Sequence, residues 1–141
     1  MTCCVTRRFQ FCAGHRLVDH EGKCAHLHGH NYVAFVTCEA PELDAVGRVI
    51  DFSVIKQVIG DWINKAWDHK MILNRGDDEG IAAVRALGDP YYPMMCNPTA
   101  ENMASEMLQV ADGLLSEQHR ITVTKVVLWE TENCYAEVNA Q

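Results

Sequence analysis

The 141-residue sequence predicts an α+β fold in the order ββααββ, an antiparallel sheet with two helices on one face. Apolar side chains alternate with a period of two near both ends of the chain, as they do in strands. Between these regions they recur at spacings of three and four, which is typical of helices with one buried face. A chain of this length can bury one core, so we expect a single domain over residues 1–141.

Two strands are expected first. Residues 28–40 are rich in β-branched and aromatic side chains and end near Pro41. Residues 2–15 alternate, and a loop over residues 16–27 connects the two strands into a long hairpin. The side chains expected on one face of the first strand are Val5, Phe9, Phe11, Ala13 and His15.

Two amphipathic helices are expected next, over residues 51–67 and 97–115. Asp51 is the expected N-cap of the first helix, whereas either Asn97 or Thr99 could cap the second.

The segments around the second helix are expected to contain turns. The turn-rich stretches "NRGDDEG" and "GDPYYP" predict that most of residues 74–96 are irregular. Residues 121–138 read as a final hairpin that turns around Glu132 and Asn133.

The composition excludes several classes of partner. A net charge of −7 makes a nucleic-acid surface improbable, although a local cluster of Arg16, Lys23 and Lys70 could still hold a small anion. No apolar run is long enough to cross a bilayer, and the first residues lack the order of a signal peptide, so we expect a cytoplasmic protein without a membrane partner. Seven scattered cysteines without a C-x-x-C pair indicate free thiols.

Histidines are concentrated in one part of the chain, and "CAHLHGH" at residues 24–30 holds three of them. His28 and His30 are two apart at the start of a strand, so both side chains leave the same face. His15 ends the preceding strand, and the hairpin can bring it beside them. Three neutral imidazoles form a zinc site whose fourth position stays open, which favours catalysis over scaffolding. His20 and His26 lie in the loop and are poorer candidates.

Cys24 lies four residues before His28 and has two possible roles. It could be a fourth zinc ligand that closes the site in a non-catalytic metal-binding module. Alternatively, the positive field of the metal could make its thiol acidic enough to serve as a general base.

Two acidic positions complete the candidate site. Asp68 precedes His69 at the end of the first predicted helix, where the carboxylate could orient an imidazole that acts as an acid or base. Glu130 ends an apolar run and could accept paired N–H bonds from a guanidine-like edge of a ligand.

Together, these residues resemble the 6-pyruvoyl-tetrahydropterin synthase and 6-carboxytetrahydropterin synthase superfamily. The resemblance covers nearly the whole chain and is carried, in the family's order, by "FCAGHRL", "CAHLHGHNY", "IDFSVIK", "WDHKMILN", "NPTAEN" and "LWETEN". It implies the tunnelling fold, in which sheets of several subunits join into a β-barrel, commonly in a homohexamer built as a dimer of trimers with active sites between subunits.

The resemblance also implies roles for individual residues. Zn²⁺ would be the cofactor, Cys24 would abstract the proton, Asp68 with His69 would complete a proton relay, and Glu130 would anchor the pterin ring. Thr99 and Glu101 are weaker candidates for binding substrate. The implied zinc ligands are His15, His28 and His30.

The implied substrate is 7,8-dihydroneopterin triphosphate, a small-molecule partner whose triphosphate needs a local cationic pocket. The three residues between Cys24 and His28 resemble the bacterial 6-carboxytetrahydropterin synthases of the queuosine (7-deazaguanine) pathway, which release acetaldehyde and triphosphate. The alternative within the superfamily is the pyruvoyl synthase, which eliminates triphosphate but keeps the side chain intact.

Overall fold

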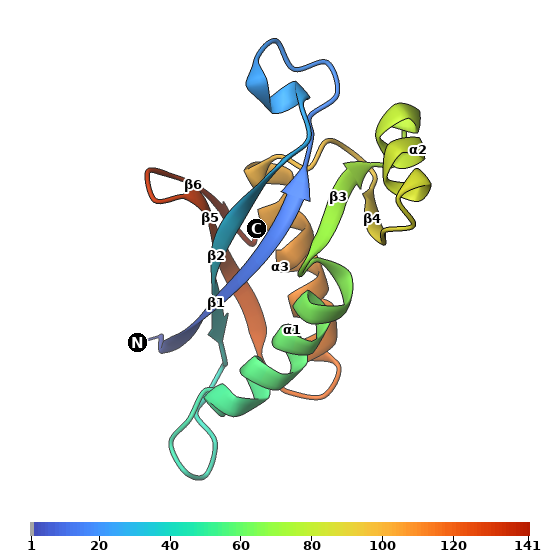
Figure 1. Ribbon diagram of the computed structural model, residues 1–141. Coiled ribbons are helices and arrows are strands. Elements are labelled where there is room, and N and C mark those ends of the chain that lie inside the picture. Colours follow the sequence, from blue (N-terminus) through green and yellow to red (C-terminus); the bar gives the residue numbers. More distant parts are fainter. Residues whose placement is uncertain (1) are drawn as a thin grey trace.

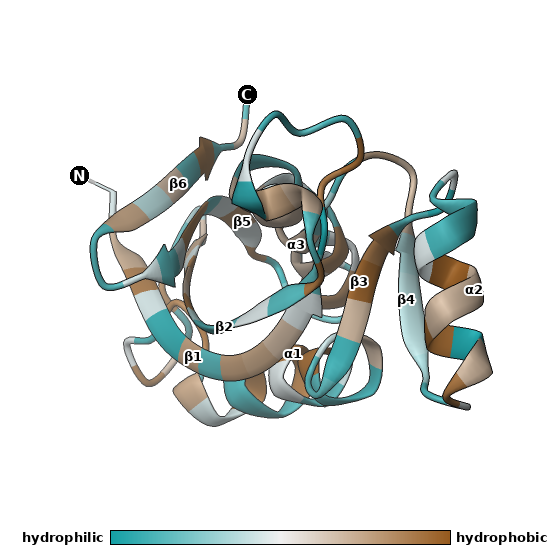
Figure 2. Ribbon diagram, turned by 45° about the horizontal axis from the view of Figure 1, so that its top comes forward, coloured by the Kyte–Doolittle hydropathy of each residue, from teal (hydrophilic) through white to brown (hydrophobic). Residues whose placement is uncertain are grey.

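The computed structural model describes residues 2–141 and contains a mixed six-stranded sheet with three helices. The strand order is β4-β3-β1-β2-β5-β6, and the sheet curls around the helices α1 and α3 (Figures 1 and 2). The strands are β1 (Cys4–His15), β2 (His28–Glu39), β3 (Lys70–Asn74), β4 (Tyr91–Met94), β5 (Thr122–Thr131) and β6 (Cys134–Asn139). The helices are α1 (Phe52–Ala66), α2 (Asp78–Ala86) and α3 (Ala100–Ser116), with a short 3₁₀ turn, Lys23–Ala25.

Both predicted hairpins and both long helices are present. β1 pairs antiparallel with β2 along its whole length, and β5 pairs antiparallel with β2 and with β6. Asp51 caps α1 by accepting a hydrogen bond from the Ser53 amide. Thr99 caps α3 by accepting one from the Asn102 amide, which decides between the two expected cap residues.

The expectation of irregular structure over residues 74–96 was wrong, because this region contains α2 and β4. β3 and β4 run parallel to β1, so the sheet is mixed rather than antiparallel, and the helices number three rather than two. Parallel neighbours need crossover connections: α2 connects β3 to β4, whereas the chain passes from β1 to β3 through β2 and α1. Ile72 and Leu73 of β3 are both fully buried, so this strand lacks the alternation that would have revealed it.

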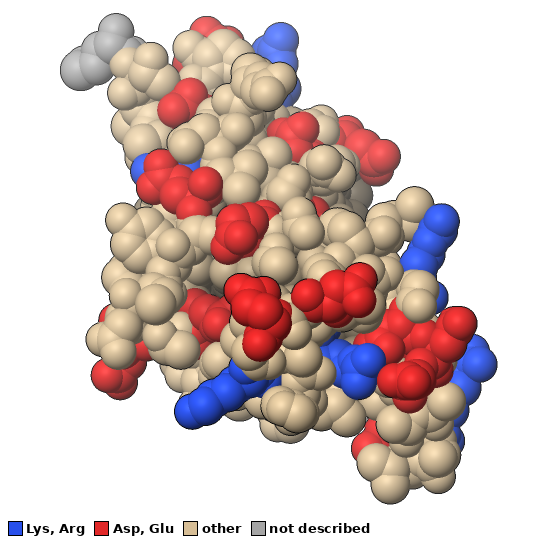
Figure 3. Space-filling view, turned by 90° about the horizontal axis from the view of Figure 1, so that it is seen from above, with Lys and Arg blue, Asp and Glu red and all other residues tan. Residues whose placement is uncertain are grey.

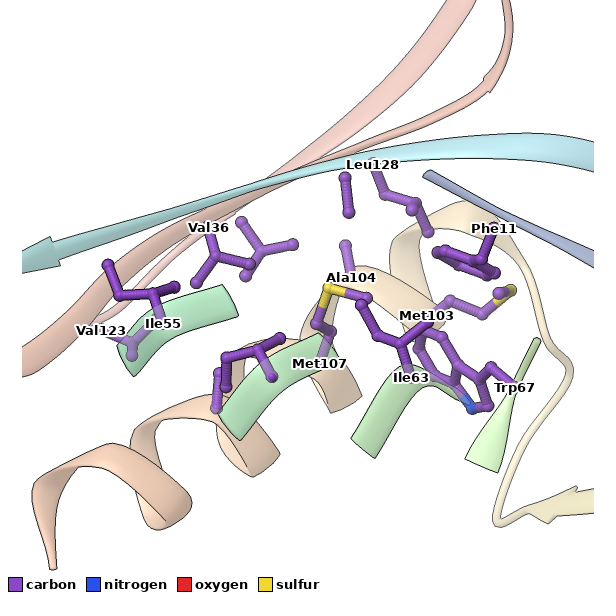
Figure 4. Packing of buried hydrophobic residues seen from close by; sticks show 14 of the residues in the cluster. Phe11, Val36, Ile55, Ile63, Trp67, Met103, Ala104, Met107, Val123 and Leu128 are labelled. Atoms are coloured by element: carbon purple, nitrogen blue, oxygen red, sulfur yellow. The ribbon is translucent and has the colours of Figure 1, made fainter. Parts of the chain in front are cut away.

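The hydrophobic core lies between one face of the sheet and the helices α1 and α3 (Figure 4). Ile55 and Ile63 of α1 belong to the same buried cluster as Met103 and Met107 of α3, and Ile55 lies toward Val123 of β5. At one end of the core, the rings of Phe11 and Trp67 pack 5.7 Å apart. This packing fixes the β1–β2 hairpin, which carries the histidine cluster where its strands meet the connecting loop. No described helix is both long enough and apolar enough to span a membrane.

Candidate metal centre and active site

His15, His28 and His30 lie together where the β1–β2 hairpin meets its loop. His15 is paired directly with His28, and His30 is paired with Ala13, two residues before His15. All three side chains leave the face of the sheet that also forms the core, and one ring nitrogen from each lies within 4.8 Å of the others. The His15 ring is 1% exposed. The strand register therefore assembles the three imidazoles, as the sequence predicted.

Hydrogen bonds to main-chain carbonyls fix the tautomers of two of these histidines. Nδ1 of His15 donates to the Pro98 carbonyl at 2.7 Å, and Nδ1 of His28 donates to the His26 carbonyl at 2.7 Å. A carbonyl oxygen only accepts, so each Nδ1 carries the proton and each Nε2 presents a lone pair when the ring is neutral. The two Nε2 atoms face each other at 3.0 Å. This arrangement suits a shared cation, because two unshared lone pairs would repel.

The third imidazole adds an unsatisfied nitrogen. Nε2 of His30 is buried and has no hydrogen-bond partner among residues 2–141, and it lies 3.4 Å from Oε1 of Glu130. Burial lowers the pKa of both His15 and His30, and the His28 ring lowers it further in each case. The hydrogen bond to the Pro98 carbonyl opposes this shift for His15, and the charge of Glu130 opposes it for both, but the pKa of each stays lowered. The lowered pKa favours the neutral ring, which is the form that binds metals. The donor set therefore fits a metal ion held by three imidazoles.

Cys24 lies in the 3₁₀ turn of the loop between β1 and β2 and is half-buried. Its carbonyl accepts a hydrogen bond from the Leu17 amide at 2.8 Å. Burial raises the pKa of Tyr32, and the charge of Glu130 raises it further. The Tyr32 hydroxyl is 3.3 Å from Nδ1 of His15. Cys24 is thus at the same end of the sheet as the three histidines.

Asp68 and His69 form a hydrogen-bonded pair after α1. Nδ1 of His69 lies 2.9 Å from Oδ2 of Asp68, while Oδ1 of Asp68 accepts from the Cys12 amide at 3.0 Å. Burial tends to raise the pKa of Asp68, but the hydrogen bonds from Cys12 and His69 outweigh it and hold the pKa below its usual range. The His69 backbone is left-handed, with φ of 60°, and its ring is 78% exposed.

A groove of about 490 Å³ lies beside His69 of this pair. Its lining includes His30 and the exposed residues Cys12 and Asn31, whose side chains leave the face of the hairpin opposite to the histidine cluster. Gly14 and Gly29, paired opposite each other in the hairpin, also line it, so its floor is partly bare backbone. The groove offers space for a small ligand beside His69 of the acid–base dyad.

The predicted substrate-binding residues differ in their surroundings. The Glu130 carboxylate lies beside His30, at the metal centre. Thr99 uses its hydroxyl to cap α3, and Glu101 lies exposed in the first turn of that helix. The structure therefore brings Glu130 to the metal centre. No hydrogen bond or ion pair within residues 2–141 joins Thr99 or Glu101 to the three histidines.

The three basic candidates for anion binding differ in whether their side chains already have a partner. Arg16 is paired through Nε with the buried carboxylate of Asp77 at 2.7 Å, so it joins the hairpin to the start of α2. Lys70 donates to the Lys65 carbonyl at the end of α1. In the described part of the chain Lys23 has no ion pair, since those of residues 2–141 involve other side chains. Figure 3 shows this end of the molecule with acidic side chains prominent near its centre.

Sequence reasoning missed Tyr32 and Pro98. Tyr32 shares the parity of His28 and His30, so the alternation of the strand could have placed it beside them. The Pro98 carbonyl could not have been found, because a main-chain acceptor has no side-chain signature.

The chain resembles known proteins over almost its full length. The family described as 6-pyruvoyl tetrahydropterin synthase matches residues 4–141. A 6-carboxy-5,6,7,8-tetrahydropterin synthase of Rickettsia bellii is 41% identical over 134 residues, which cover 94% of this chain and 97% of that protein. A probable enzyme of the same name from Halobacterium salinarum is 37% identical over 127 residues, which cover 89% of this chain and 79% of that one.

Solved structures have the same fold. An uncharacterized protein of Wolinella succinogenes has a TM-score of 0.82 at 21% identity and is matched over 100% of this chain and 99% of that one. The 6-pyruvoyl tetrahydropterin synthase of Caenorhabditis elegans has a TM-score of 0.70 at 24% identity, over 100% and 97% of the two chains. These likenesses confirm the predicted tunnelling fold for the single chain.

Proposed function

Because the chain belongs to the 6-pyruvoyl tetrahydropterin synthase family and is therefore an enzyme of that family, we propose that it is a zinc-dependent 6-carboxy-5,6,7,8-tetrahydropterin synthase. The proposed reaction converts 7,8-dihydroneopterin triphosphate and one water molecule to 6-carboxytetrahydropterin, acetaldehyde and triphosphate, and would make the protein a lyase of queuosine biosynthesis. The observation that carries this proposal is the cluster of His15, His28 and His30 beside Glu130, in a chain 41% identical to a protein of that name.

His15, His28 and His30 would hold the zinc ion through ring nitrogens that the tautomers leave free. When bound, zinc supplies a Lewis acid that makes the C–H bonds of the substrate side chain more acidic.

The other residues have proposed roles in binding and proton transfer. The Cys24 thiolate takes the proton from carbon, and His69, oriented by Asp68, exchanges a second proton as triphosphate leaves. The Glu130 carboxylate accepts paired N–H bonds from the pterin edge, with Thr99 and Glu101 as secondary substrate contacts. Lys23 is the best placed of the basic candidates for triphosphate, because Arg16 and Lys70 already have partners.

The proposed assembly is a homohexamer, a dimer of trimers, of a single tunnelling-fold synthase domain over residues 1–141, located in the cytoplasm. Open strand edges support this proposal. β3 pairs only with residues 13–15 of β1, so residues 4–12 have a strand partner on one side alone. β6 ends the sheet on the other side. Such unpaired edges are surfaces on which a second copy can continue a sheet.

The deciding experiment is mass-spectrometric analysis of the products from zinc-loaded protein and 7,8-dihydroneopterin triphosphate. We expect 6-carboxytetrahydropterin together with acetaldehyde. The description of the family favours one alternative, the pyruvoyl synthase, and 6-pyruvoyltetrahydropterin as end product without acetaldehyde would establish it instead.

A second measurement tests the role of Cys24. We expect Cys24→Ala to abolish turnover and to retain zinc, while the exposed-cysteine control Cys3→Ala retains both. Sulfur in the zinc coordination shell of the wild-type protein, measured by X-ray absorption, would instead indicate the closed, non-catalytic site.

A further inference from the structure

The loop over residues 16–27 carries Cys24 but has few attachments to the rest of the protein (Figure 1). It reverses direction at Asp19, which has φ of 65°. The Leu17 amide then joins the two limbs of the loop by donating to the Cys24 carbonyl. The position of Cys24 therefore depends on what holds Leu17 and its neighbours.

Asn97 provides that attachment. Its Oδ1 accepts a hydrogen bond from the Val18 amide at 3.0 Å, and its Nδ2 donates to the Val18 carbonyl at 2.8 Å. Among residues 2–141, these are the hydrogen bonds that connect residues 17–25 to a residue outside the loop. A carboxamide suits this task because it offers one acceptor and one donor side by side, as a peptide group does.

Asn97 is itself held rigidly at the start of α3. Its carbonyl accepts hydrogen bonds from the Asn102 side chain and the Thr99 amide, both at 2.9 Å. Thr99 caps the helix, which leaves the Asn97 side chain free to bind the loop. The next carbonyl in the chain, that of Pro98, orients the His15 ring. Two consecutive residues thus fix the loop with the thiol and one ring of the metal centre to the same helix start.

We propose that Asn97 is a positioning residue, whose two hydrogen bonds to Val18 hold the Cys24 loop in register with the histidine cluster. This inference rests on the proposed function for its effect on turnover, but the attachment itself can be tested without activity. Loss of the carboxamide frees the loop while the three histidines keep their places on the sheet. Misplacement of a reacting group by about 1 Å can cost roughly 100-fold in rate.

The experiment compares Asn97→Ala with the matched control Asn74→Ala. Nδ2 of Asn74 donates to Oδ1 of Asn97 at 3.2 Å, and Oδ1 of Asn74 accepts from the Gly76 amide at 2.9 Å. The control therefore removes these two hydrogen bonds and leaves both bonds to Val18. Four quantities are measured: hydrogen exchange of the peptide containing residues 17–24, iodoacetamide alkylation of Cys24 in metal-free protein, zinc content, and the separate values of kcat and KM.

For Asn97→Ala we expect faster exchange in residues 17–24, alkylation of Cys24 faster by several-fold, and a kcat lower by roughly 10- to 100-fold. Zinc content and KM stay within about twofold of wild type, and Asn74→Ala resembles wild type in all four quantities. Unchanged exchange and alkylation in Asn97→Ala overturn the proposal, as does a fall in kcat explained by lost zinc.

Two other outcomes can be distinguished from those above. If Asn97→Ala does not fold, Asn97→Asp decides, because it keeps the acceptor for the Val18 amide and replaces the donor by a carboxylate oxygen that cannot bind the Val18 carbonyl. The expected result is then an intermediate increase in exchange and alkylation, and wild-type values of both overturn the proposal. If the wild-type protein lacks the synthase activity but the loop is released as expected, the proposed function fails while the attachment by Asn97 stands.

Discussion

His28 and His26 are two residues apart, but their side chains have different surroundings. The His28 ring belongs to the three-histidine cluster, whereas the His26 side chain is exposed and contributes only its carbonyl, which accepts from His28. We predict that His28→Ala weakens zinc binding by at least about 100-fold, while His26→Ala, which keeps that carbonyl, binds zinc within a few-fold of wild type. Competition with a chelator of known affinity measures both, and equal losses in the two variants would contradict the assignment.

The Asp68 carboxylate gives a pH prediction. Its folded-state pKa lies below the ordinary value of 3.8, because hydrogen bonds from Cys12 and His69 outweigh the effect of burial. The ionised carboxylate therefore stabilises the folded state above pH 3.8, and this stability is lost as the pH falls through the folded-state pKa. Urea unfolding should show that Asp68→Asn is less stable than wild type at pH 7 and that the difference shrinks toward pH 3. A difference that grows on acidification would contradict this sign.

At the scale of elements, the start of α3 concentrates several functions. The Thr99 hydroxyl accepts from the Asn102 amide at 3.1 Å and satisfies one of the free N–H groups of the first turn. We predict that Thr99→Ala lowers the free energy of unfolding by about 1 kcal/mol, whereas Thr99→Ser retains it. Denaturant unfolding measures this directly. If the two variants are equally stable, the cap does not contribute as described.

The elements differed in how far the sequence revealed them. α1 and α3 are long and have one buried face, so the spacing of Ile55, Ile59 and Ile63 is enough to predict a helix. α2 has nine residues and β4 has four, which is too short for a periodic pattern to be distinguished from turns. β4 also contains Pro93, which argued against a strand.

At the scale of the whole molecule, the sheet is unfinished on both sides. Residues 4–12 of β1 pair with β2 on one side only, β6 pairs only with β5 in the described chain, and Tyr135 of β6 is exposed. We predict by light scattering a mass six times that of the 15.9-kDa chain. The mass of a single chain at micromolar concentration would exclude an obligate hexamer.

The sequence by itself determined the longer elements, namely both hairpins and the helices α1 and α3, and the candidate chemistry. The alternation of β1 and β2 placed His15, His28 and His30 on one face, because side-chain direction in a strand repeats every two residues. Cys24 and the Asp68–His69 pair were also visible, since their residue types carry their chemistry with them.

Only the tertiary structure decided which partners these residues have. Arg16 forms an ion pair with Asp77, and His15 donates a hydrogen bond to the Pro98 carbonyl. The loop with Cys24 is held by hydrogen bonds between Asn97 and Val18. These contacts link positions about 60 to 80 residues apart, and those of His15 and Asn97 depend on main-chain groups that every residue possesses. Their selection requires the packed sheet and helices, because only the complete fold brings one particular carbonyl or amide within hydrogen-bonding distance.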